Sequence, residues 1–232
     1  NTRPDVAYSV AMLCRAMSRP TPELYDAALR VLYYLYYSRD IGLRYAASPV
    51  SLTGMSDSDW ATRHSTTGWC FMYSQALVSW SSKKQTTVAL SSCEAEIMAL
   101  SEASKEAAYL RRFFEELGIG ADGPTSLSTD NSAARDLSYN PEHHERTKHI
   151  ERRHFYIREL VENGDLVVPL VSTVDNYSDF FTKALKPPAF YKFRNLIMNV
   201  DPERCRADSS TGGCSSEHGG VSESGPAGSG AV

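Results

Sequence analysis

The chain has 232 residues, of which 42% are hydrophobic, and its formal net charge at pH 7 is −4. These values are typical of a soluble globular protein that holds one generous domain or a domain with appendages. They exclude binding to nucleic acid through overall charge, and no stretch approaches the ~18 apolar residues of a membrane span, so no membrane partner is expected.

The termini and the cysteines set further bounds. The five cysteines are odd in number and share no C-x-x-C spacing, which predicts neither a disulfide framework nor a zinc site. A reducing, intracellular setting is therefore expected. The first residues, NTRPDVAYSV, contain no initiating Met and no signal-peptide pattern, so we interpret the chain as a fragment of a longer protein.

Two helices are predicted at the start of the chain, from about Asp5 to Met17 and from about Pro22 to Tyr37. The proline-containing segment 18–22 separates them, and Pro22 suits a first helical turn. Residues 31–37, VLYYLYY, are too apolar on all sides for a lone surface helix. They are expected to contact either a missing part of a parent protein or simply the core of this one.

From Leu43 the pattern changes to short strands. One ends near Asp57, a second spans Gly68 to Tyr73, and a third runs from Leu77 to Ser81 after a turn at residues 74–76. A long helix is then predicted from Ser91 to Leu117, because Gly, Pro and β-branched residues are almost absent from this segment.

The start of this long helix contains two glutamates, Glu94 and Glu96, which we expect to have different roles. Ser91 and Glu94 form the S-x-x-E pattern of a capping box. Glu96, in contrast, projects at about 100° per residue into the apolar stripe of the helix. That stripe consists of Leu100, Ala103, Ala107, Leu110, Phe114 and Leu117.

A carboxylate on a core-facing stripe needs an explanation. An unpaired buried charge is costly, so Glu96 requires a cationic partner, protonation or a bound metal ion. Alternatively, it leans out past a sheet edge, since it lies within the first two turns of the helix.

The second half of the chain alternates between strands and helices, and its order predicts an α/β protein with a sheet of mixed strand direction. After a loop at 118–124, the predicted elements are a strand at Ser126–Thr129, a short helix from Ser132, a charged helix at about His144–Glu162, a turn at Asn163-Gly164, a strand at Leu166–Val171, a helix at about Asn176–Leu185 that Pro187-Pro188 ends, and a last helix to about Asn199. The segment from Pro202 is rich in Gly, Ser and Glu and is predicted to be disordered.

Three further acids recur at strand ends and helix starts. Asp57 and Asp130 end predicted strands, and Asp179 lies in the first turn of the predicted helix after the last strand. Such positions converge at one edge of an α/β sheet, so these acids and Glu96 are expected to meet there. Each Asp taken alone is also explained as a turn former or a helix N-cap.

Four carboxylates in one place favour a metal site. They cannot all stay ionised unless a cation neutralises them, and all-oxygen ligation favours Mg²⁺ or Mn²⁺ over zinc. Two such ions about 4 Å apart assist phosphodiester cleavage. The pattern therefore indicates a metal-dependent nuclease.

Several motifs in this order make the chain resemble a known family. SDSDW, STTGW, VSWSSKKQTTVALSSCEAEIMALSEASKEAAYLRR, STDNSAARDL, ERTKHIERRHFYIREL and SDFFTKAL cover most of residues 43–198. They resemble the ribonuclease H domain at the C-terminus of the Pol polyprotein of copia-type retrotransposons. The preceding segment resembles the end of the reverse transcriptase of the same polyprotein.

This resemblance implies a ribonuclease H-like fold, a five-stranded mixed sheet flanked by helices and here preceded by a small helical segment. It implies cleavage of the RNA strand of RNA/DNA hybrids with two Mg²⁺ ions. Matched to the family, the catalytic and metal-binding residues are Asp57, with Asp59 as the second choice, Glu96, Asp130 and Asp179.

The same resemblance implies a division into residues 1–42 from the reverse transcriptase (connection), 43–200 as the nuclease domain and 201–232 as a tail. The expected partners are an RNA/DNA hybrid and the rest of the polyprotein, including reverse transcriptase and integrase. The expected location is a cytoplasmic virus-like particle or the nucleus. The alternative is a catalytically silent nucleic-acid-binding or structural module of a decayed retroelement.

Two groups of residues are expected to contact nucleic acid. Lys83 and Lys84, placed on a loop beside Trp80, are expected to lie near the site. The charged helix adds a local basic density that the net charge hides, or else a solvated helix with Glu pairs. Its candidates are Arg146, Lys148, Arg152 and Arg153.

Four histidines, His143, His144, His149 and His154, suggest a zinc site at first sight. Their spacings do not place paired ligands on one helical face, and no cysteine lies nearby, so zinc is not expected.

Overall fold

The computed structural model describes residues 2–47, 51–60, 64–120, 123–139 and 148–200, with the backbone alone at 148–152 and 154. Residues 1–200 form one compact unit. Its five strands are β1 (Thr53–Asp59), β2 (Thr66–Tyr73), β3 (Ala76–Lys84), β4 (Thr125–Ser128) and β5 (Leu166–Val167). The helices are α1 (Ala7–Cys14), α2 (Pro22–Tyr37), α3 (Ser92–Glu116), α4 (Ser132–Tyr139), α5 (Lys148–Glu162) and α6 (Pro187–Met198), and the 3₁₀ turns are η1 (Pro4–Val6), η2 (Thr173–Asp175) and η3 (Tyr177–Phe181).

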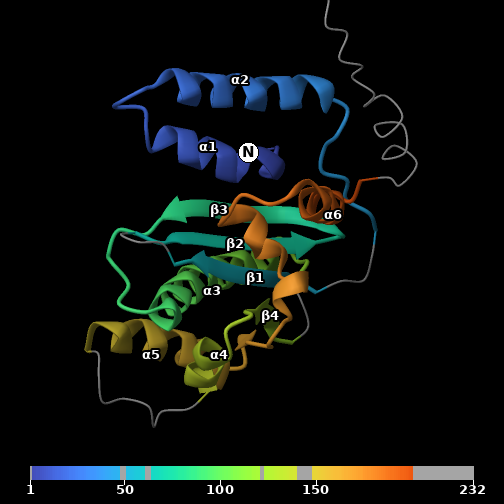
Figure 1. The fold of residues 1–232 in the computed structure, drawn as a ribbon. Coiled ribbons are helices and arrows are strands. Elements are labelled where there is room, and N and C mark those ends of the chain that lie inside the picture. The colour runs from blue at the N-terminus through green and yellow to red at the C-terminus, as the bar shows by residue number, and fades with distance from the viewer. Residues whose placement is uncertain (1, 48–50, 61–63, 121–122, 140–147, 201–232) are drawn as a thin grey trace, which may run out of the picture. The chain divides into compact units, whose positions relative to one another are not determined.

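The five strands form one mixed sheet in the order β3-β2-β1-β4-β5. Figure 1 labels the first four of these, from β3 to β4. β1, β2 and β3 pair antiparallel, whereas β4 pairs parallel with both β1 and β5. Ser74 and Gln75 join β2 to β3 with positive φ angles of 51° and 69°, the backbone of a tight two-residue hairpin turn. The strand order and directions confirm the expected ribonuclease H-like fold.

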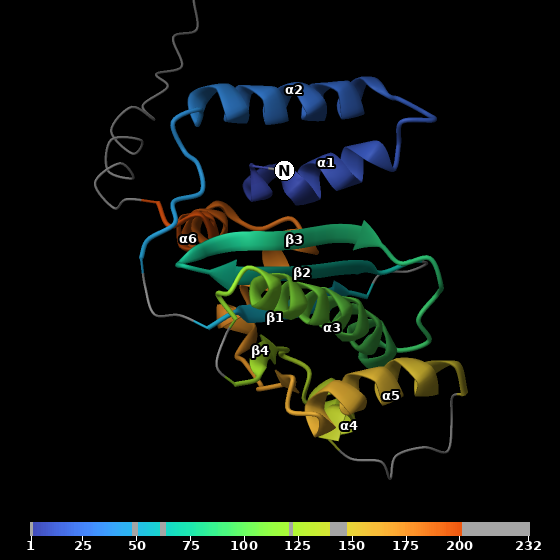
Figure 2. The ribbon, with the colours of Figure 1, turned by 180° about the vertical axis from the view of Figure 1, so that it is seen from behind.

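Helix α3 covers one face of the sheet, as Figure 2 shows from behind. Its apolar stripe is buried as predicted from Leu100 to Phe114, but the predicted last member, Leu117, is the C-cap and is 56% exposed. The buried stripe packs with Phe71 of β2 and Leu127 of β4 in the larger core cluster. A second core cluster lies on the opposite face, where Phe181 and Ile197 meet Cys70 and Leu77. Both faces of the sheet are therefore covered, which leaves its edges and strand ends for chemistry.

The first predicted helix is shorter than expected. Residues 4–6 form η1, and α1 ends at Cys14 rather than near Met17. The predicted strand from Leu166 to Val171 is also shorter. Pro169 has no N–H to donate, so β5 ends at Val167 and pairing resumes only as an isolated bridge between Thr129 and Leu170.

The predicted helix at Asn176–Leu185 is wrong. The segment forms the 3₁₀ turn η3, in which every residue from Tyr177 to Phe181 is buried. A surface helix buries one stripe of its residues, so a continuous buried run does not suit one. Asn176 anchors the turn, because its side chain accepts from the N–H of Ser178 and donates to the carbonyl of Ser56. Pro187 and Pro188 start α6 instead of only ending a preceding helix.

A buried polar network joins the N-terminal helices to each other, and a ring contact links them to α6. Tyr34 of α2 donates its hydroxyl to Asp5, which also forms an ion pair of 2.8 Å with Arg3. The Tyr34 ring lies 5.7 Å from that of Phe190 in α6. In contrast, Tyr33 and Tyr37 on α2 are 60% and 79% exposed. Core packing thus explains only one side of the predicted apolar run.

Within the part of the chain that the structure describes, no helix combines the length and apolar character needed to cross a membrane. The predicted boundary at residues 42 and 43 remains a prediction, and the predicted tail lies outside the described residues.

Candidate metal centre

The pairing of β1 with β4 places Asp57 and Asp130 side by side along the two strands. Met55 pairs with Ser128 in parallel register, and each aspartate lies two residues further along its own chain. Because parallel neighbours run in the same direction, both carboxylates reach the same end of the sheet. β1 itself extends to Asp59, a partly buried residue outside the acidic group described below.

Helix α3 brings Glu96 to this edge. Its first turn is held by the predicted capping box, in which Ser91 accepts from the N–H of Glu94 at 3.1 Å. The carboxylate of Glu94 in turn accepts from the N–H of Leu90 at 2.7 Å. Glu94 therefore fixes the start of the helix, and Glu96 is left to face the sheet.

The carboxylates of Asp57, Glu96 and Asp130 converge, with one oxygen of each within 4.8 Å of the others. Glu96 is only 6% exposed, which excludes the interpretation that it leans out past the sheet edge. Its Oε1 accepts from the N–H of Ser58 at 3.3 Å, while its Oε2 is buried without a hydrogen-bond partner among the described residues.

The surroundings of Glu96 and Asp57 oppose their ionisation. Burial, followed by the charges of Asp57 and Asp130, raises the pKa of Glu96 to about 9. Burial also raises the pKa of Asp57 to about 7, with Asp179 and Asp130 adding to the increase. A hydrogen bond from Thr182 and the charge of Lys183 act in the opposite direction on Asp57.

A divalent cation fits this group of oxygens. It would neutralise the clustered charge and give the orphaned Oε2 of Glu96 a partner. Oxygen-only donors favour a hard cation. Of the explanations that the sequence left open for Glu96, no ion pair reaches it from the described residues, so protonation and metal binding remain.

Asp179 lies next to the three acids but is held differently. It is buried in η3 and its Oδ1 lies 2.7 Å from Nζ of Lys183. The neighbouring Thr182 donates a short hydrogen bond to Oδ2 of Asp57. Sequence reasoning missed both Thr182 and Lys183. Their positions three and four residues after Asp179 could have indicated them, because residues at this spacing lie on the same side of a helical turn.

Gly68 leaves the space that Thr182 occupies. It pairs with Asp57 across the strands, and a Cβ there would come within 2.5 Å of Cγ2 of Thr182 and 3.1 Å of the backbone of Phe181. Replacing Gly68 with alanine is expected to destabilise the protein by roughly 1–3 kcal/mol, because η3 must move. Urea unfolding measures this.

Gly42 provides the control for that substitution, because a Cβ at this position meets nothing within 4 Å. The control removes the same backbone freedom from the unfolded chain. Equal stability of the Gly68→Ala and Gly42→Ala variants would show that η3 does not press on β2.

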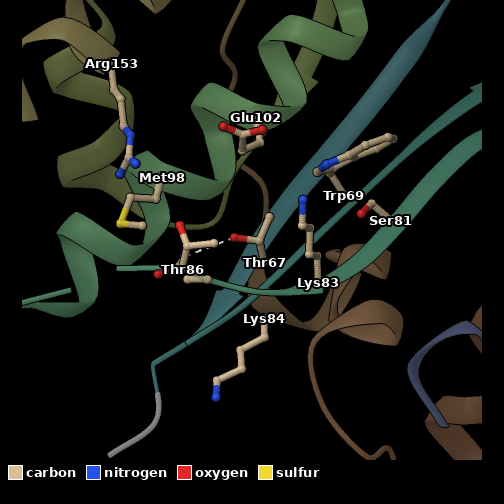
Figure 3. A pocket seen from close by; sticks show the side chains of 10 residues that line it. Thr67, Trp69, Ser81, Lys83, Lys84, Thr86, Met98, Glu102 and Arg153 are labelled. Carbon is tan, nitrogen blue, oxygen red and sulfur yellow. Dashed lines mark hydrogen bonds between the residues drawn. The ribbon is translucent and has the colours of Figure 1, made fainter. Parts of the chain in front are cut away.

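The predicted basic residues lie in several places. Lys83 and Lys84 end strand β3 rather than a loop, and they point to opposite faces of the sheet (Figure 3). Lys83 lines a pocket of about 230 Å³ together with Thr67, Gln85 and Arg153. This pocket adjoins the acidic group, because Thr67 pairs with Ser58.

Trp80 does not share that pocket. It packs against the second core cluster on the other face of the sheet. Arg146 lies outside the described residues, as do the side chains of Lys148 and Arg152. The same holds for His143 and His144 and for the side chains of His149 and His154.

Comparison with known proteins identifies relatives of the chain. No protein-family model matches the chain. The Retrovirus-related Pol polyprotein from transposon TNT 1-94 of Nicotiana tabacum is 38% identical over 200 residues, 84% of this chain. That from transposon RE2 of Arabidopsis thaliana is also 38% identical, over 201 residues. The chain is homologous to one segment of the retrovirus-related Pol polyproteins of transposons. It spans only 15% and 14% of the lengths of these two Pol polyproteins.

Solved structures of similar fold include ribonuclease H1 from the halophilic archaeon Halobacterium salinarum NRC-1. It is 15% identical to this chain, with a TM-score of 0.43, and the match covers 56% of this chain and 93% of that one.

Proposed function

We propose that this Pol segment is a metal-dependent endonuclease that cleaves the RNA strand of RNA/DNA hybrids during reverse transcription. The observation that carries the proposal is the group of three buried carboxylates from β1, α3 and the end of β4, which has little counter-charge. Such a group is costly unless it binds a cation, and in a Pol polyprotein a site of this kind suits the hydrolysis of a phosphodiester.

The residues that would hold the metal are Asp57, Glu96, Asp130 and Asp179, with two Mg²⁺ ions as the proposed cofactor and Mn²⁺ as a substitute. When bound, the ions would activate a water for in-line attack on phosphorus and stabilise the departing 3′ oxygen, which gives 3′-hydroxyl and 5′-phosphate ends.

The chain's own contribution is to hold these oxygens in place before substrate arrives. The Ser58 N–H orients Glu96, and Thr182 orients Asp57. Burial of both acids restricts water around them and strengthens every charge interaction in the site. Fixed, desolvated charges of this kind stabilise a transition state better than mobile ones.

We assign the pocket of Lys83 to the nucleic-acid backbone. Three cations line it from two elements, Lys83, Lys84 and Arg153, beside one acid, Glu102 (Figure 3). Thr67, Ser81 and Thr86 add hydroxyl groups. Cations with hydroxyl donors suit a phosphate, and recognition through shape and backbone implies little sequence preference.

Lys83→Ala is expected to weaken hybrid binding roughly threefold to tenfold and to lower the slope of log affinity against log salt by about one. Fluorescence anisotropy with an uncut hybrid, in the absence of divalent cations, measures both. Lys186→Ala, an exposed lysine outside the pocket, is the control. An unchanged salt slope for Lys83→Ala would remove this residue from the interface.

The wider context is proposed from the family. Residues 1–42 would be the connection from the reverse transcriptase, 43–200 the nuclease domain and 201–232 a tail. The exposed aromatic side of α2 suits contact with the reverse transcriptase, and integrase would be a further part of the polyprotein. The place of action would be a cytoplasmic virus-like particle or the nucleus.

A labelled RNA/DNA hybrid incubated with the whole chain and Mg²⁺ tests the proposal. We expect cleavage by the unmodified chain and none by Asp57→Asn, which should still bind the hybrid. The opposing hypothesis, a silent module of a decayed element, predicts binding without cleavage by both proteins. That second result would reject the nuclease.

A further inference from the structure

Lys183 pairs with a buried acid although its own side chain is partly exposed. Its ammonium forms an ion pair with Asp179, a carboxylate that is only 6% exposed. Its own side chain, however, is 41% exposed. The acid is therefore enclosed, whereas the lysine side chain is partly in contact with solvent.

The backbone around Asp179 explains why the acid stays in place. Phe180 and Phe181 on its C-terminal side are buried in the second core cluster, and Asn176 anchors the start of the turn. Thr182 contacts Asp57 at the same time. One short segment thus links Asp57 to Asp179 and ends in a partly exposed lysine.

Lys183 also acts on the acids beyond its direct partner. Partial burial lowers the pKa of Lys183, but the ion pair with Asp179 and the charges of Asp57 and Asp130 outweigh this and raise it above its ordinary value. The ammonium thus lies within the field of the acidic group. A divalent cation at Asp57 and Asp179 would meet that positive charge at short range.

We propose that Lys183 is a built-in counter-cation, which holds Asp179 until a divalent cation displaces it and so sets the affinity of the centre for its second cation. The inference rests on the proposed metal centre and goes beyond it, because it orders the two binding events. The first cation takes the preformed group of Asp57, Glu96 and Asp130. The second must release Lys183 from Asp179. Lys183 is therefore a positioning residue.

Binding of Mn²⁺ to the whole chain without nucleic acid tests this, with the free ion followed by electron paramagnetic resonance. Two Mn²⁺ ions are expected to bind, and the Lys183→Gln variant should bind the second, more weakly held ion about tenfold more tightly than the unmodified chain does. Lys183→Met, which keeps the aliphatic stem, should do the same, and Lys183→Arg should restore the weak affinity. Lys186→Gln makes the same charge change three residues away and should have little effect.

Thermal unfolding in EDTA is the second readout. Metal-free Lys183→Gln should unfold at a lower temperature than Lys186→Gln, because the carboxylates lose their counter-charge, and Mn²⁺ should remove the difference. Equal or weaker Mn²⁺ affinity in both Lys183→Gln and Lys183→Met would overturn the inference, as would a chain that binds no Mn²⁺. Mn²⁺ binding without hybrid cleavage would reject the proposed nuclease. The role of Lys183 would still be tested, because it is judged from the Mn²⁺ affinities of the variants alone.

Discussion

Replacing Glu96 with glutamine is expected to reduce hybrid cleavage by about a thousandfold. The substitution keeps the shape of the side chain and its contact with the Ser58 N–H, but it removes the charge that faces Asp57 and Asp130. A neutral amide is a weak ligand for a hard cation, so the divalent ions would lose affinity and position. Single-turnover cleavage of a labelled hybrid at saturating protein measures the chemical step without the contribution of binding.

The control for this variant is Glu116→Gln, an exposed position at the far end of α3. It should cleave at the rate of the unmodified chain. A Glu96→Gln protein that retained most of the activity would show that Glu96 is not a metal ligand. This conclusion would not depend on results for the other acids.

The metal-free protein is expected to lose stability as the pH rises. The pKa of Asp57 is raised to about 7 and that of Glu96 to about 9 in the folded state, well above the values of an unfolded chain. The folded protein therefore binds more protons than the unfolded one in this range, and its free energy of unfolding falls with pH. Between about pH 4 and about pH 9 the expected loss is on the order of a few kcal/mol.

Chemical unfolding in EDTA across this pH range measures the loss. The Asp57→Asn, Glu96→Gln double variant should show a flatter profile and a higher stability than the unmodified chain at about pH 8, because both raised pKa values are removed. Divalent cations should restore stability to the unmodified chain at high pH and not to the double variant. Parallel pH profiles for the two proteins would contradict the electrostatic description of the site.

The sequence was sufficient for the parts of the site that follow from periodicity. The apolar stripe of α3 placed Glu96 toward the core, and the S-x-x-E pattern assigned Glu94 to the cap, both as the structure has them. The ends of strands β1 and β4 placed Asp57 and Asp130 at one edge. Helix and strand periods decide which way a side chain faces, so local pattern carried these predictions.

The sequence was not sufficient where tertiary contacts override local pattern. The segment around Asp179 was predicted as a helix, but Asn176 and the buried run after it impose a 3₁₀ turn. The pocket of Lys83 depends on the approach of α5 to β3, which lie far apart in the chain. The contact of Thr182 with Asp57 spans 125 positions, and no local signal contains such a pairing.

The central claim is that the acidic group of Asp57, Glu96 and Asp130 is a metal centre that cuts RNA in a hybrid. The most direct measurement uses a hybrid with a differently labelled RNA and DNA strand, incubated with the whole chain with Mg²⁺ or with EDTA. The claim predicts cleavage of the RNA strand alone, with 5′-phosphate products, and only with Mg²⁺. Cleavage of both strands, cleavage in EDTA, or no cleavage by a chain that binds the hybrid would contradict it.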